Sequence, residues 1–118
     1  MRDEKQSKLS GKMIISEDVL IREIINEKQT ALVLVNSRWN GTAQIARSGF
    51  DELKKEYGDT VRFNRIMTED LKILGNILNL GYSPSWLFYY HGELKEVVHG
   101  LRPVDEVKKH LNTMLNGM

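Results

Sequence analysis

Apolar and polar positions along the chain change their period several times, and each period predicts an element. Residues 31–35 are apolar throughout and bounded by polar residues, which is typical of a central strand covered on both faces by helices. From residue 42 to residue 57 the apolar positions share one face at helical spacing, which predicts a four-turn helix ended by Gly58. Residues 61–66 alternate imperfectly and predict a second strand.

The N-terminal part of the chain divides into a polar segment and a short amphipathic helix. Residues 1–12 hold Leu9 as their only strongly apolar side chain besides the initiator Met, so we expect a flexible tail ahead of a single domain at 13–118. A brief edge strand is expected at 13–15, followed by a helix that Ser16 caps. The apolar positions of this helix are Leu20, Ile21, Ile24 and Ile25.

The C-terminal half predicts a helix, a hairpin and a last helix. Acidic residues 69–70 are expected to open the first of these helices. Its apolar positions are Leu71, Leu74 and Leu78. The aromatic and β-branched runs 86–90 and 94–98 have a period of two and are joined by a short connection, which predicts a β-hairpin. The last amphipathic helix begins at Pro103, in the first helical position, and ends near Gly117.

The predicted elements follow the order β-α-β-α-β-α-β-β-α. Alternating strands and helices favour parallel pairing in the first part of the chain, and the hairpin adds antiparallel strands. We therefore expect one α/β domain in which helices cover both faces of a mixed sheet.

Composition narrows the possible functions. Among 118 residues, 17 basic and 16 acidic side chains leave a formal charge of +1, so no summed field attracts the chain to nucleic acid or to an anionic membrane. No apolar run approaches the roughly 18 to 20 residues of a membrane-spanning helix, and the N-terminal sequence is polar, so we expect a cytoplasmic protein. The absence of cysteine excludes disulfides, thiolate nucleophiles and thiolate metal sites.

Four short motifs carry a resemblance to a known family. They are Trp39-Asn40-Gly41-Thr42-Ala43 between a strand and a long helix, Tyr82-Ser83-Pro84-Ser85 before the hairpin, His91-Gly92-Glu93 in its turn, and Gly100 after it. In order and spacing these motifs resemble the thioredoxin family, whose members have Trp-Cys-Gly-Pro-Cys, a cis-proline loop, an Asn-Gly-Glu hairpin and a late glycine. The resemblance runs without a gap from about Ala31 to Leu115. It implies a thioredoxin-like three-layer α/β/α sandwich.

The redox chemistry of that family does not carry over to this sequence. Asn40 and Ala43 occupy the positions of the two cysteines that attack and resolve a disulfide, and neither side chain can replace a thiolate. Leu34 stands where the family has a buried aspartate, and Arg65 stands in the place of its lysine partner. We therefore expect no thiol-disulfide oxidoreductase. Because no other nucleophile and base occur at a recognisable spacing, we expect no enzyme.

The resemblance also implies a shallow groove that receives an extended peptide and needs no sulfur. By position its residues are Trp39, Asn40, Tyr82, Ser83, Pro84 and Gly100. Ser83, before a cis-proline, would present its backbone to a partner strand, and the aromatic side chains would add contact area. Structural interpretations stay open beside this one: Trp39 as a packing residue, Asn40 or Thr42 as the cap of the next helix, and Pro84 as cis for the fold alone.

Two functions from different classes follow. The preferred hypothesis is a redox-inactive chaperone or adaptor that binds a protein or peptide partner in the groove, as a monomer or weak dimer. Cysteine-lacking thioredoxin-like chaperones of hydrogenase maturation share this description, in fold and missing cysteines only. The alternative is a structural or self-assembly domain that packs through its hairpin edge or the hairpin's aromatic residues. His91, His99 and His110 lack the spacing of metal ligands, so neither a metal site nor a cofactor is expected.

Overall fold

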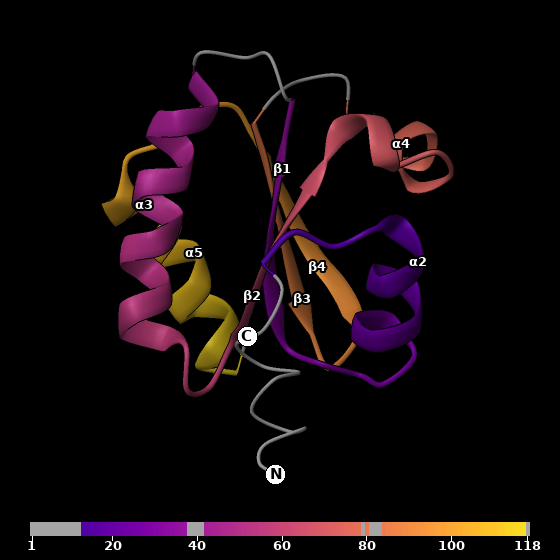
Figure 1. Ribbon diagram of the computed structural model, residues 1–118. Coiled ribbons are helices and arrows are strands. Elements are labelled where there is room, and N and C mark those ends of the chain that lie inside the picture. The colour runs from indigo at the N-terminus through magenta and orange to yellow at the C-terminus, as the bar shows by residue number, and fades with distance from the viewer. Residues whose placement is uncertain (1–12, 38–41, 79, 81–83, 118) are drawn as a thin grey trace, which may run out of the picture.

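The computed structural model describes residues 13–37, 42–78, 80 and 84–117, and the flexible tail predicted at 1–12 lies outside these residues. The described part is built on a mixed sheet whose strands are β1 (Ala31–Asn36), β2 (Arg62–Met67), β3 (Ser85–Tyr90) and β4 (Glu93–His99). Their order across the sheet is β2-β1-β3-β4 (Figure 1). β1 pairs in parallel with β2 and antiparallel with β3, and β3 and β4 form the predicted hairpin.

Helices cover both faces of this sheet. One face carries α3 (Thr42–Tyr57) and α5 (Val104–Leu115), which pack on one apolar cluster (Figure 1). The other face carries α2 (Glu17–Val19), the π-helix η1 (Leu20–Ile25) and α4 (Leu74–Ile77), beside a second apolar cluster. The predicted three-layer α/β/α sandwich with a mixed sheet is confirmed.

The layering explains the all-apolar run of β1. Successive side chains of a strand point to opposite faces of the sheet. Leu32 and Leu34 belong to the cluster under α3 and α5, whereas Val33 and Val35 belong to the cluster on the α2 side. Every residue of β1 is buried. A strand covered on both faces needs apolar side chains in succession, as the sequence predicts.

The aromatic strand of the hairpin is part of the core. Trp86 and Phe88 lie in the cluster under α3 and α5, and Leu87 and Tyr89 lie in the cluster on the α2 side. Each of these four side chains is at most 2% exposed. Tyr90, the remaining aromatic residue of β3, is only partly buried, so little of the aromatic surface proposed for self-assembly is exposed.

The helix expected to begin at residues 69–70 is wrong in its extent. A 3-10 turn, η2 (Thr68–Asp70), is followed by Leu71 with φ −101° and ψ 82°, and α4 is a single helical turn. Leu71 leaves the helical conformation and is buried in the cluster on the α2 side. The carboxylate of Glu17 then accepts the backbone N–H groups at the start of α4. Tertiary contacts thus interrupt a helix that local spacing favours.

The N-terminal elements also differ from their predicted form. The edge strand expected at 13–15 reduces to one parallel bridge between Ile14 and Arg65. Ser16 caps α2 as expected, because its Oγ accepts the N–H of Val19 at 3.3 Å. The turns that follow form η1 rather than a regular α-helix. Both kinds of helix bury one apolar side, so the pattern of apolar positions does not distinguish them.

The last helix begins one residue later than predicted. Pro103 has φ −60° and ψ 147°, so it is the N-cap of α5 and not its first helical residue. The fixed φ of proline suits either position. The helix buries Val107, Leu111 and Met114 and ends before Gly117, whose φ is +81°.

Candidate functional site

Two of the six predicted groove residues lie in the described part of the chain. Pro84 is buried and directly precedes β3, and Gly100 directly follows β4. Hairpin pairing brings them together, and the N–H of Gly100 donates to the carbonyl oxygen of Pro84 at 2.7 Å. The other groove residues, and with them the predicted cis bond before Pro84, lie outside the described residues; they are Trp39, Asn40, Tyr82 and Ser83.

Gly100 presents an open backbone position at this end of the hairpin. Its φ is +91°, in the left-handed region that favours glycine. A Cβ at this position would have no heavy atom of the described residues within 4 Å. The backbone conformation, and not close packing, therefore requires glycine here. The face of Gly100 that lacks a side chain is left uncovered by the described residues.

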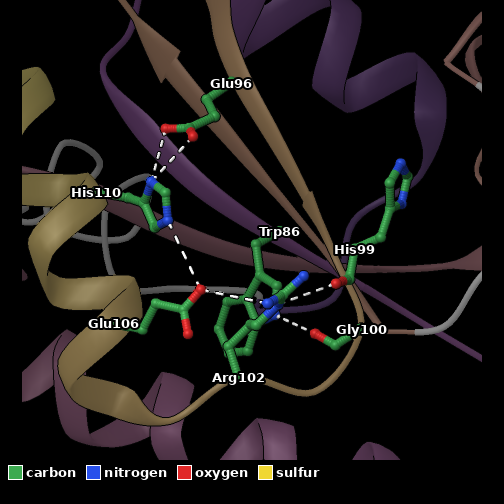
Figure 2. Close-up of polar contacts among 7 residues, drawn as sticks. All are labelled: Trp86, Glu96, His99, Gly100, Arg102, Glu106 and His110. Atoms are coloured by element: carbon green, nitrogen blue, oxygen red, sulfur yellow. Dashed lines mark hydrogen bonds and ion pairs between the residues drawn. The ribbon is translucent and has the colours of Figure 1, made fainter.

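Side chains from β3 and from the start of α5 hold the turn at Gly100 (Figure 2). Trp86 Nε1 donates to the carbonyl oxygen of Gly100 at 3.0 Å, and Arg102 Nε donates to the carbonyl oxygen of His99 at 3.1 Å. Arg102 Nη1 also pairs with the Glu106 carboxylate at 3.3 Å. Sequence reasoning missed this role of Trp86. The available signal was that a buried indole N–H needs an acceptor.

Ser85 and His99 form a polar pair at the same end of the hairpin. They are register partners in β3 and β4, and Ser85 Oγ lies 3.1 Å from His99 Nδ1. Ser85 is fully buried, so its hydroxyl is out of reach of a substrate. The ring of His99 points away from the cluster of Glu106 and His110 (Figure 2). The pair ties the start of β3 to the end of β4.

The other two histidines make structural contacts. His110 Nδ1 lies 2.9 Å from the Glu96 carboxylate, which links α5 to β4 (Figure 2). His91 has φ +52° in the hairpin turn, and its ring meets that of Tyr90 edge to face with centroids 4.3 Å apart. Within the described ranges, no group of three His, Asp or Glu side chains is arranged to hold a metal ion.

Four exposed apolar side chains belong to segments on both faces of the sheet, near the end that carries Gly100. Five large apolar side chains of the described residues are at least 41% exposed. Ile45 lies in the first turn of α3, and Leu101 lies in the loop after β4. Ile73 and Ile77 belong to the α4 segment. Both α4 and the start of α3 lie near the end of β1 (Figure 1). Only Ile14, beside β2, is found elsewhere among these five.

An apolar side chain and an arginine occupy the place of the family's buried aspartate and lysine. Leu34 is fully buried and is the register partner of Arg65. Arg65 Nε is buried with no hydrogen-bond partner among the residues described. Burial lowers the pKa of Arg65, Arg47 lowers it further, and Asp51 opposes both effects. The position therefore lacks the carboxylate that assists the family's dithiol.

Comparisons with known proteins agree with this geometry. No family model matches the chain. Over 78 aligned residues the chain is 28% identical to the chloroplastic M-type thioredoxin of Spinacia oleracea. The aligned region covers 63% of this chain and 43% of the spinach protein. The crystal structure of chloroplastic thioredoxin z superposes with a TM-score of 0.77 at 18% identity and covers 90% of this chain and 96% of the other. The fold of the chain is that of the thioredoxins.

The chain lacks the cysteine motif of the thioredoxins, because it contains no cysteine. It spans less than half the length of the spinach thioredoxin. The structure of thioredoxin z is reported to define a novel type-specific target recognition, which is a property of that protein. None of the helices in the described ranges is long and apolar enough to cross a membrane.

Proposed function

We propose that this thioredoxin-like protein is a redox-inactive chaperone or adaptor that binds an extended segment of a partner protein. The binding surface is the predicted groove, formed by Trp39, Asn40, Tyr82, Ser83, Pro84 and Gly100. One observation carries the proposal: exposed Leu101 directly follows Gly100, whose side without a side chain is open among the described residues, and Ile45 is exposed in the first turn of α3. Exposed apolar side chains beside an open backbone position offer contact area to an extended partner chain.

The proposal assigns no catalytic step to the chain. Thiol-disulfide exchange needs a thiolate, and the sequence has Asn40 and Ala43 at the two cysteine positions. Ser85 is the described hydroxyl nearest to Pro84 in sequence, and it is buried and bonded to His99. Binding, in contrast, requires only backbone groups and apolar contact area. A cytoplasmic location stays a prediction from the sequence.

Strand addition is the binding mode that fits the hairpin end. The Pro84 carbonyl oxygen already accepts the N–H of Gly100, so a partner backbone has to pair elsewhere. In the family that the sequence resembles, the residue before the cis-proline serves this purpose, and here that residue is Ser83. The open face of Gly100 lets a partner chain approach closely, and Ile45 and Leu101 supply apolar contacts.

Binding of a permanently unfolded polypeptide tests this proposal. The probe is fluorescein-labelled α-lactalbumin that has been reduced and carboxymethylated, and fluorescence anisotropy measures its affinity. We expect Trp39→Ala and the double variant Ile45→Ser/Leu101→Ser each to bind about tenfold or more weakly, because burial of one large apolar side chain contributes about 1.5–3 kcal/mol.

Ile14→Ser is the matched control for these variants. Ile14 is 45% exposed beside β2, away from the groove, so its loss is expected to leave the affinity unchanged. Circular dichroism and thermal melting check that each variant folds. Equal affinity in wild type and the groove variants, or an equal loss in Ile14→Ser, would overturn the groove proposal.

A further inference from the structure

The carboxylate of Glu17 fixes α4 from the neighbouring helix. Glu17 opens α2, and its two oxygens accept the backbone N–H of Lys72 at 3.2 Å, of Ile73 at 3.2 and 3.0 Å, and of Leu74 at 2.6 Å. Ile73 is the N-cap residue of α4 and supplies no side-chain cap. A residue separated by 55 positions from Lys72 thus provides the cap that the sequence of α4 lacks.

The segment held in this way exposes two isoleucines. Ile73 is 59% exposed and Ile77 is 69% exposed. They are four positions apart with helical backbone between them, so they lie on one side of the turn. Leu74 and Leu78 pack against the apolar cluster on the α2 side, which anchors α4 to the body of the protein. The two isoleucines are therefore held in place and left open.

We propose that Ile73 and Ile77 form a second contact for the bound partner segment and receive one of its aliphatic or aromatic side chains. Glu17 is the positioning residue of this contact, because it holds the turn that carries both isoleucines. The inference rests on the proposed function, and it adds that the partner segment must carry an aliphatic or aromatic side chain at one position. α4 and the start of β3 lie toward the same end of the sheet, so one extended segment can reach both surfaces (Figure 1). Side-chain contacts select a sequence, which backbone pairing alone does not.

The size of this surface favours a peptide side chain over a second copy of the chain. Two partly exposed isoleucines offer far less apolar surface than the about 800 Å² per partner that a stable dimer buries. A single aromatic side chain, which buries about 150–250 Å², is closer to the size of this surface. The occupant is therefore one apolar side chain of an extended segment.

Peptide selection tests the second contact. A phage-displayed library of random short peptides is selected against the wild-type full chain, and we expect the recovered peptides to share one aliphatic or aromatic position. A synthetic peptide with that residue is expected to bind Ile73→Ser/Ile77→Ser about tenfold or more weakly than wild type. The same peptide with serine at that position is expected to bind both proteins equally.

Glu17 is tested with the same two peptides. Glu17→Ala is expected to weaken binding of the apolar peptide and to leave binding of the serine peptide unchanged. Glu17→Gln, whose amide oxygen still accepts N–H groups, is expected to restore part of the affinity. Asp18→Ala is the control, since Asp18 is the next residue on α2 and pairs with exposed Arg22. A general loss of stability would weaken binding of both peptides alike and would overturn the positioning role.

The outcomes separate this inference from the groove proposal. Selected peptides without a shared apolar position, or equal binding to wild type and Ile73→Ser/Ile77→Ser, overturn the second contact. The groove proposal then stands if Ile45→Ser/Leu101→Ser still weakens binding. A library that yields no binder to the wild-type chain overturns both.

Discussion

Two glycines with positive φ allow the effect of backbone strain on stability to be distinguished from an effect on binding. Gly100 and Gly117 have φ of +91° and +81°, and a Cβ at either would have no described heavy atom within 4 Å. Gly100 belongs to the proposed groove, whereas Gly117 follows the last turn of α5. Replacement of either glycine by alanine therefore strains the backbone to a similar extent, but only the replacement at Gly100 lies in the proposed binding surface.

Gly100→Ala is expected to reduce the free energy of unfolding by about 1–2 kcal/mol, because alanine is strained at this φ. It is also expected to weaken binding of unfolded α-lactalbumin, since the added methyl group projects into the space proposed for the partner. Gly117→Ala should reduce stability without changing affinity. Urea denaturation and fluorescence anisotropy measure the two effects. Unchanged affinity in Gly100→Ala would contradict the proposed path of the partner.

Tyr89 is a buried phenol whose ionisation is coupled to unfolding. Burial raises its pKa to about 12, whereas an unfolded chain has a tyrosine pKa of about 10. The unfolded state therefore releases this proton first as the pH rises. The stabilising contribution is complete below about pH 10 and is lost between about pH 10 and 12, at about 1.4 kcal/mol per pKa unit.

Phenolate absorbance measures this titration. Burial raises the pKa of Tyr89 to about 12, so we expect a step of phenolate absorbance near that pH. Tyr89→Phe should remove this step. If the absorbance of the wild-type protein rose in one transition near pH 10 while the fold persisted, the assigned effect of burial would be wrong.

At the scale of elements, α4 depends on α2 more than on its own sequence. α4 is Leu74–Ile77, far shorter than the roughly 12 to 15 residues at which an isolated helix becomes marginally stable. Its first N–H groups bind the carboxylate of Glu17 in α2. Packing and this borrowed cap therefore hold α4, and its propensity contributes little.

Glu17→Ala is expected to reduce the free energy of unfolding by about 1 kcal/mol, the usual effect of losing a helix cap. It should also speed hydrogen exchange at the amides of Ile73 and Leu74, which NMR measures residue by residue. Asp18→Ala should cost less than about 0.5 kcal/mol, because it removes only an exposed pair four residues apart. Unchanged exchange at Ile73 and Leu74 would show that packing alone holds α4.

Long amphipathic elements could be predicted from the sequence, and short ones could not. The structure confirms the helix at Thr42–Tyr57, since its repeating apolar face buries residues such as Phe50 and Leu53 on the sheet. The strands of the hairpin are observed within one residue of their predicted limits. The segment after residue 68 differs, because the burial of Leu71 and the carboxylate of Glu17 override its local spacing.

At the scale of the whole molecule, the two edges of the sheet influence whether chains associate. The outer edge of β2 is partly covered, because Ile15 N–H donates to the Arg65 carbonyl oxygen at 2.8 Å and Arg65 N–H to that of Met13 at 2.6 Å. β4 carries exposed Glu93 and Lys95, whose charged groups lie 3.1 Å apart. Covered backbone and charged side chains both oppose edge-to-edge pairing of strands.

We therefore expect a monomer at micromolar concentration, measured by sedimentation velocity. A stable dimer would contradict this expectation and favour the structural alternative in which the hairpin edge packs on a partner. Lys95→Pro would then locate the contact, because proline is tolerated on edge strands and opposes pairing with a further strand. A dimer that this variant abolishes would use the β4 edge.

The candidate site could be predicted only in outline. Hairpin pairing brings Pro84 and Gly100 together, and the groove that these residues are proposed to line stays a prediction. The indole of Trp86, which donates a hydrogen bond to the Gly100 carbonyl oxygen, was not predicted as part of the site. From the sequence, a tryptophan in an apolar strand is expected to be a core residue. The acceptor of the indole N–H could be identified only once the register of β3 against β4 was known.

Composition and local pattern are sufficient for the first conclusions about this protein. A chain without cysteine has no thiol chemistry in any conformation, and an apolar run such as β1 is stable only when helices cover both faces of its sheet. Exposure and capping are different, because they depend on segments far apart in the sequence. The sequence pattern does not tell whether Ile73 and Ile77 are buried or exposed, because this depends on how α4 packs on the sheet. The Glu17 carboxylate accepts the N–H groups of α4 only in the folded protein, because the two segments are far apart in the sequence.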